Sequence, residues 1–243
     1  MHQVTGTNPD VLMMLLADAR LPTGGHTQSG GLEPALRSGM PAGHVPAYVA
    51  ARLATTARVE AGTAVVARHV ALTASAAGGP VPGDPTLDDV CAAWAARTPS
   101  AALREASARL GRGHLRLLRR LWAGHAALAA LERALAPRGA RQSAPRAVVL
   151  GVLAACAGLD AVRLARLVAY DDAQTVAAAS LKLAPGDPAE TTAWLLAAGP
   201  DVDDLVAEVA HLTRPDQIPA HGAPLVEQWA ELHVRTTERL FHA

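Results

Sequence analysis

Residues 98–121 read TPSAALREASARLGRGHLRLLRRL, and their spacing indicates the fold class more clearly than any other part of the chain. Thr98-Pro99 is typical of a helix start, because proline is tolerated in the first turn. Positions suited to a buried face then recur every three or four residues: Leu103, Ala106, Leu110, His114, Leu117 and Leu121. That interval is the period of an amphipathic helix, so we expect one long helix with an apolar face here.

The composition of the whole chain also favours helices. Half of the 243 residues are hydrophobic, with alanine and leucine the main contributors, and only 3% are aromatic. Such small apolar side chains suit packed helices better than sheets, and no stretch alternates with the period of a half-buried strand. The sequence therefore predicts an all-α fold, a single-domain bundle of about ten helices over residues 1–243. We expect the termini, 1–8 and 236–243, to be flexible or ordered by a partner.

Capping residues, glycines and prolines predict where the helices begin and end. Asn8-Pro9 indicates an N-cap followed by proline in the first turn, and Thr86 with Asp89 indicates a capping box. We expect a helix break near Gly62. Residues 160–183 form either one helix or two helices that meet near Asp171-Asp172. The clearest exposed loops are residues 78–85 and 137–145.

Charge and motif spacing exclude several classes of function. The formal net charge is zero, so no overall field attracts nucleic acid or an anionic membrane. The longest uncharged apolar run, residues 147–159, is shorter than the ~18–20 residues of a membrane span. None of the ten histidines pairs with another at the spacing of shared metal ligands, and Lys182, the only lysine, lies outside any P-loop. We therefore expect no catalytic residues, no metal site and no stably bound cofactor.

The cysteines and the N-terminal segment indicate a cytoplasmic protein. Cys91 and Cys156 lie far apart in apolar helical segments, which favours free thiols over a disulfide or a metal pair. Free thiols suit a reducing compartment. The short apolar run at residues 11–17 follows Asp10 and has no basic residue before it, so it does not fit an export signal.

Two other classes of function stay open. An all-α DNA-binding regulator could use the basic stripe Arg104, Arg109, Arg112, Arg116, Arg119 and Arg120, but the chain lacks the surplus of positive charge and the aromatic residues that such a site needs. An all-α metal-dependent enzyme could use the pairs Asp88-Asp89, Asp171-Asp172 and Asp203-Asp204. Adjacent residues of a helix point about 100° apart, however, so positions at helix starts and turns explain these acids better.

Several stretches, taken in order, resemble the urease accessory protein UreF family. LPTGG and SGGLE are similar to the opening signature of that family, LREASARLG to its central helix, and AAASLKL and RLF to its later helix and its tail. These stretches are residues 21–25, 29–33, 103–111, 177–183 and 239–241. Their order and spacing cover nearly the whole chain. Residues 26–28 (HTQ) and 184–187 (APGD) depart from the family pattern, which indicates a divergent branch.

The resemblance implies a non-catalytic homodimer that binds a second accessory subunit, UreD (also called UreH). That pair would recruit the GTPase UreG and dock on apo-urease, so nickel and GTP would be handled by the complex rather than by this chain. No nucleic acid or membrane is implied as a partner. The predicted partner-binding residues are Thr23, Gly24, Gly25, Glu33, Arg104, Arg109, Lys182, Arg239, Leu240 and Phe241.

For four of these positions the residue type itself, apart from the resemblance, suggests a role. Lys182 is the only lysine beside 21 arginines, which indicates a position where the planar guanidinium does not fit, or else a chance survivor on a solvated face. Arg109 can pair with Glu105 one helical turn away, a structural role that ranks above partner binding. Gly24 and Gly25 permit close approach of a partner or a second copy, or simply a tight turn.

Phe241, the only phenylalanine, lies three residues from the end of the chain. A terminus is poorly ordered unless something holds it, so the ring either anchors a partner or folds back onto the core of this chain. Anchoring of a partner is the preferred hypothesis.

Overall fold

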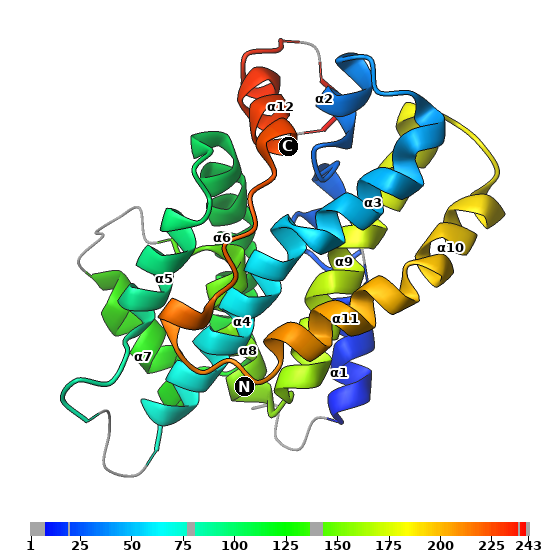
Figure 1. The fold of residues 1–243 in the computed structure, drawn as a ribbon. Helices are drawn as coiled ribbons and strands as arrows, with labels where there is room; N and C mark the ends of the chain where they lie inside the picture. Colours follow the sequence, from blue (N-terminus) through cyan, green and yellow to red (C-terminus); the bar gives the residue numbers. More distant parts are fainter. Residues whose placement is uncertain (1–7, 19, 77–80, 137–142, 238, 242–243) are drawn as a thin grey trace.

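The computed structural model confirms an all-α fold. It describes residues 8–18, 20–76, 81–136, 143–237 and 239–241. These residues contain twelve α-helices and no strand, or ten helices when the pairs separated by a single residue, α3 with α4 and α10 with α11, are counted together. Figure 1 shows them packed into one bundle. The expected bundle of about ten helices is therefore confirmed.

Some helices follow one another almost directly, whereas longer segments join others. In chain order they are α1 (Pro9–Leu16), α2 (Leu32–Arg37), α3 (Val45–Ala54), α4 (Thr56–Thr73), α5 (Leu87–Ala96), α6 (Ala101–Leu121), α7 (Ala126–Leu135), α8 (Arg146–Ala157), α9 (Ala161–Leu183), α10 (Pro188–Ala197), α11 (Gly199–Val209) and α12 (Pro224–Val234). The structure also describes the short 3₁₀ turns η1 (Gly25–Thr27), η2 (Ala42–His44) and η4 (Pro215–Gln217).

Helices α4, α8 and α9 form the centre of the bundle, and α4 packs most extensively against the other two. Nine consecutive residues of α8, 147–155, are buried. Gly151 permits the close contact with α4, because a Cβ there would lie 2.3 Å from the Ala64 carbonyl oxygen. Helices α3, α10 and α11 pack against α9, whereas α6 and α7 pack against α8 (Figure 1). The core thus joins segments from both halves of the chain.

Local capping signals are confirmed. The Asn8 side chain accepts the backbone N–H of Asp10 at 2.9 Å, at the start of α1. Thr86 and Asp89 form the capping box of α5, in which each side chain accepts the backbone N–H of the other residue. Such contacts span four residues or fewer, so the local sequence is sufficient to predict them.

Several helix ends differ from the sequence prediction. The break expected near Gly62 is wrong, because the chain bends at Thr55 and Gly62 lies inside α4. A Cβ at Gly62 would lie 2.8 Å from the Pro219 ring, so this glycine serves a packing contact. The start expected at Thr98 is also wrong, since Ser100 is the N-cap of α6. Helix α9 is continuous through Asp171-Asp172, so the alternative of two helices is wrong.

Other expectations fall partly outside the described residues. Residues 78–80 and 137–142 of the two expected loops lie outside the described part of the chain, as do residues 1–7, 238, 242 and 243 of the expected termini. Neither Cys91, which is buried, nor Cys156, which is half-buried, forms a disulfide. Among the described residues, no helix is both long and apolar enough for a membrane span.

Candidate functional site

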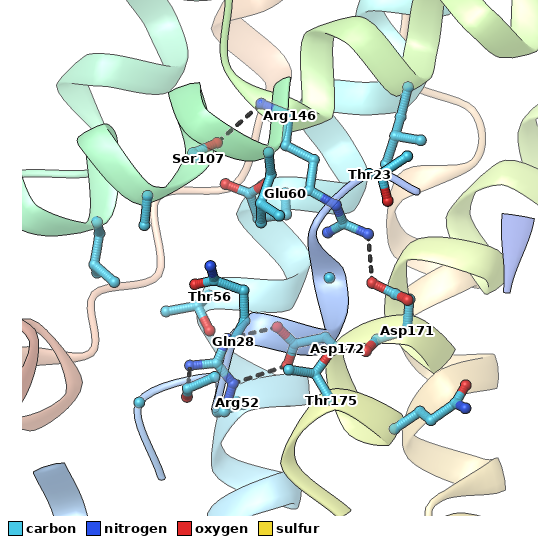
Figure 2. Close-up of a pocket in the computed structure, with 18 of the residues that line it drawn as sticks. Thr23, Gln28, Arg52, Thr56, Glu60, Ser107, Arg146, Asp171, Asp172 and Thr175 are labelled. Carbon is cyan, nitrogen blue, oxygen red and sulfur yellow. Dashed lines mark hydrogen bonds and ion pairs between the residues drawn. The ribbon is translucent and has the colours of Figure 1, made fainter. Parts of the chain in front are cut away.

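Polar side chains surround a cavity of about 350 Å³ in the middle of the bundle. Helices α3, α4, α6, α8 and α9 contribute to its wall together with the segment that joins α1 to α2. Figure 2 shows side chains from these elements pointing toward one another around the cavity. An ionisable group inside a bundle is stable only when it is paired with an opposite charge or is in its neutral form. The partners of each group therefore show which role it has in the site.

Arg52 of α3 is the hub of one side of the cavity. Its Nε and Nη2 donate to the two carboxylate oxygens of Asp172 at 2.9 and 2.5 Å, and its Nη1 donates to the Gly30 carbonyl at 2.8 Å. Burial alone would lower the pKa of Arg52, but the Asp172 carboxylate raises it above its usual range. The guanidinium therefore stays charged and ties α3 to α9 and to the glycine segment before α2.

Arg146 makes the corresponding pair on the opposite side (Figure 2). Its Nη2 donates to Asp171 at 2.5 Å, and its backbone N–H donates to the Ser107 hydroxyl at 2.9 Å, which joins α8 to α9 and α6. Burial raises the pKa of Asp171, while Arg146 opposes that shift. Asp171 thus pairs with an arginine of α8, and Asp172 with an arginine of α3. Our interpretation of this acidic pair as a helix start or turn is wrong.

Burial shifts the pKa values of two further titratable groups in the wall, Glu60 and His114. Burial raises the pKa of Glu60, which accepts a hydrogen bond from the Trp94 indole at 2.6 Å. Burial also lowers the pKa of His114 to about 4, with Arg146 adding to the effect, and its Nδ1 donates to the Leu110 carbonyl at 2.9 Å. At neutral pH the imidazole is uncharged.

The end of the chain closes against this site. Glu33 of α2 is fully buried, and its two carboxylate oxygens accept the backbone N–H groups of Leu240 and Phe241, each at 2.9 Å. His233 Nε2 donates to the Phe241 carbonyl at 3.1 Å. Lys182 Nζ lies 5.3 Å from the centroid of the Phe241 ring, and both residues line the cavity.

The Phe241 ring is 4% exposed and belongs to the core of this chain. The hypothesis that it lies in water until a partner covers it is therefore wrong. The alternative, in which the ring folds back onto the core, is confirmed. The sequence could not decide between them, because the receiving carboxylate lies 208 residues away in the chain.

The predicted partner-binding residues fall into two groups. Thr23, Gly25, Lys182 and Phe241 line the cavity, and Glu33 and Leu240 adjoin them through the backbone contact. Gly24, Arg104, Arg109 and Arg239 lie outside the cavity wall. No observation tests their partner-binding role, which stays a prediction.

The arginines of α6 make contacts within the chain. Arg104 Nη1 donates to the carbonyls of Thr98 and Pro99, both at 2.7 Å. Arg109 pairs with Glu105 at 3.0 Å, which confirms the predicted pair. Of the rest of the stripe, Arg116 donates to the Pro22 carbonyl at 2.9 Å, so part of it serves the bundle itself.

The glycine segment is a turn packed against α6. Gly24 has a φ of +91°, a conformation that glycine tolerates, whereas a Cβ on Gly25 would meet nothing within 4 Å. The close approach occurs instead at Gly113 of α6, where a Cβ would lie 2.4 Å from the Thr23 carbonyl oxygen. Sequence reasoning missed this contact, although two glycines so close together in one helix, Gly111 and Gly113, were a signal for it.

Taken together, these observations describe an all-α domain whose buried charges join its helices and hold its C-terminal residues. A family model for UreF matches residues 41–199. The chain is 33% identical over 231 residues to the urease accessory protein UreF of Mycobacterium sp. (strain JLS). The match covers 94% of this chain and 96% of the relative.

It is also 32% identical to UreF of Mycolicibacterium vanbaalenii over the same shares of both chains, and 35% identical to UreF of Mycobacterium tuberculosis (strain H37Rv) over 74% of this chain and 76% of the relative. The chain belongs to the UreF family. The resemblance found in the sequence is thereby confirmed.

Proposed function

We propose that this chain is a urease accessory protein that, together with UreD and UreG, assembles the nickel centre of apo-urease. The observation that carries the proposal is the match to proteins named urease accessory protein UreF over 94% of the chain. In this role the chain contributes binding surface and geometry and catalyses no reaction. Nickel is the cargo of the complex, and GTP is hydrolysed by the partner GTPase.

The geometry of the polar cavity supports a scaffold role. Arg52 and Arg146 each hold a carboxylate of α9 and also a group of another element, Gly30 and Ser107 respectively. Glu33 is likewise engaged with the end of the chain. Side chains used in this way fix the relative positions of helices, which a scaffold needs in order to present a surface of constant shape.

Partner binding is proposed for groups that remain accessible near this framework. Leu240 is 71% exposed although its backbone N–H is held. Arg239, next to it in the chain, and Lys182, beside the Phe241 ring, are exposed as well. An exposed apolar side chain with basic residues near it in the chain or the fold suits a partner surface that is apolar with an acidic rim. We further propose a homodimer and a cytoplasmic location.

Co-expression with UreD, UreG and the urease subunits tests this function. We expect a complex that contains this chain, UreD and UreG after affinity purification, and urease that contains nickel and is active. Omission of this chain should leave the urease subunits folded but poor in nickel. Normal nickel content and activity without this chain, or failure to co-purify with UreD, would contradict the proposal.

A further inference from the structure

We propose that Leu240 and Phe241 act as a strap, which the buried Glu33 carboxylate holds closed over one end of the polar cavity. The inference concerns this chain alone, so it stands or fails independently of the proposed partners. It rests on three observations: how the strap is held, what the Phe241 ring covers, and how little structure must change when the strap leaves.

The strap is held mainly through its backbone. Two successive N–H groups, of Leu240 and Phe241, point at the two oxygens of one carboxylate, and His233 donates to the carbonyl that follows. Hydrogen bonds to a charged acceptor are roughly twice as strong as neutral ones. Because the Leu240 side chain is 71% exposed, this residue contributes its N–H group and little else to the closure.

The Phe241 ring is the part that closes the cavity. It lines the cavity beside Lys182 of α9, whose Nζ lies 5.3 Å from the ring centroid, and its backbone N–H is held by Glu33 of α2. The ring thus fills the space between α9 and α2, two helices that pack against each other at this end. Helix α12, which precedes the strap, also packs against α2 (Figure 1). Lys182 at this end is exposed, so the cavity already meets solvent there; without the ring, solvent would also reach the buried part of the α9 wall at Ala179.

The strap can leave without unfolding a helix. Helix α12 ends at Val234, and residues 239–241 have no regular secondary structure. Glu33 keeps Arg37 at 3.0 Å and His233 Nε2 at 3.8 Å, so its carboxylate is not stranded when the backbone N–H groups move away. Opening therefore costs the strap contacts only. A terminal segment with so few anchors is suited to reversible release.

Site-resolved thiol labelling tests the strap. Ala179 of α9 lines the cavity and is 2% exposed, so Ala179→Cys reports whether a small alkylating reagent such as iodoacetamide enters. Cys156, half-buried on α8, is labelled in the same sample and reports general loosening of the bundle. Mass spectrometry gives the rate at each cysteine separately. The comparison uses Phe241→Ala and Glu33→Gln in the Ala179→Cys chain, with Leu240→Ala as the matched control.

We expect Phe241→Ala to speed labelling at position 179 by about ten- to a hundredfold, the factor that corresponds to loss of one buried ring. Glu33→Gln should also speed labelling at position 179, because an amide lacks the charge and one of the two acceptor oxygens of the carboxylate. Leu240→Ala should leave the rate unchanged. Equal rates at position 179 in all chains would overturn the proposal, and so would an equal rise at Cys156.

Discussion

Arg52 and Asp172 are 120 residues apart in the chain, yet their side chains share hydrogen bonds of 2.9 and 2.5 Å inside the bundle. Neither side chain is more than 13% exposed. Removal of one partner leaves the other charge buried, so Arg52→Met should lower the free energy of unfolding by about 3–5 kcal/mol. The double variant Arg52→Met/Asp172→Leu should lose much less than the two single losses combined. Urea denaturation of the four chains measures this coupling, and additive losses would contradict it.

Gly113→Ala should destabilise the bundle although alanine favours helices. The new Cβ would lie 2.4 Å from the Thr23 carbonyl oxygen, and forced repacking typically costs about 1–3 kcal/mol. Helix propensity alone would change stability in the opposite direction by up to about 1 kcal/mol. Gly199→Ala is the control, since a Cβ there meets nothing within 4 Å. A Gly113→Ala chain as stable as the natural one would show that the loop yields easily.

His114 should make the bundle sensitive to mild acid. Its pKa falls from an ordinary value near 6.5 to about 4 in the folded chain, so acid favours the unfolded state, which binds the proton more readily. The contribution of the neutral imidazole is complete above pH ~6.5 and is lost as the pH falls toward 4. Between pH 7 and 5, the natural chain should lose about 2 kcal/mol more than His114→Leu. Urea denaturation of both chains at pH 7 and pH 5 measures the difference. If the two chains lose the same free energy of unfolding between these pH values, His114 is not the source of the acid sensitivity.

Lys182→Ala should impair urease activation, and Lys182→Arg should restore part of it. The ammonium group lies 5.3 Å from the Phe241 ring centroid, a contact worth about 0.5–1 kcal/mol at an exposed site. Melting temperature should therefore change little, and activation in the co-expression assay is the informative measurement. If both variants activate urease normally, the lone lysine is a chance survivor on a solvated face.

A chain that ends at Thr237 should be less stable. It loses the buried Phe241 ring, so the melting temperature should fall by about 3–12 °C. UreD binding, measured where both chains are folded, tests a separate point. Weaker binding supports the partner site predicted at Arg239 and Leu240, and equal binding removes it.

The fold was predictable where it depends on short-range contacts. Asn8 caps α1 and Thr86 with Asp89 caps α5 as expected, since the groups involved are neighbours in the chain. Gly62 was misinterpreted because its role comes from Pro219, a residue of a distant segment. Propensity places a break at such a glycine, whereas tertiary packing keeps the helix intact.

The candidate site was only partly predictable. The sequence singled out Glu33, Lys182 and Phe241, which the fold brings together. It predicted that they bind a partner protein, however, and not that they contact one another. It missed the role of Arg52 and Arg146 altogether. Pairing between distant helices depends on their packing, and one sequence does not determine that packing. The adjacent acids of α9 were the available signal, since two carboxylates inside a long helix require cations from elsewhere.

The contact between Glu33 and Leu240 joins groups 207 residues apart, so it also bears on the order of folding. During synthesis Glu33 leaves the ribosome 207 residues before Leu240, whose N–H group it binds. Contacts of such long range form slowly, because the intervening chain must first be ordered. A nascent molecule can therefore assemble its central helices before residues 240 and 241 have emerged, but it cannot yet make the contact with Glu33.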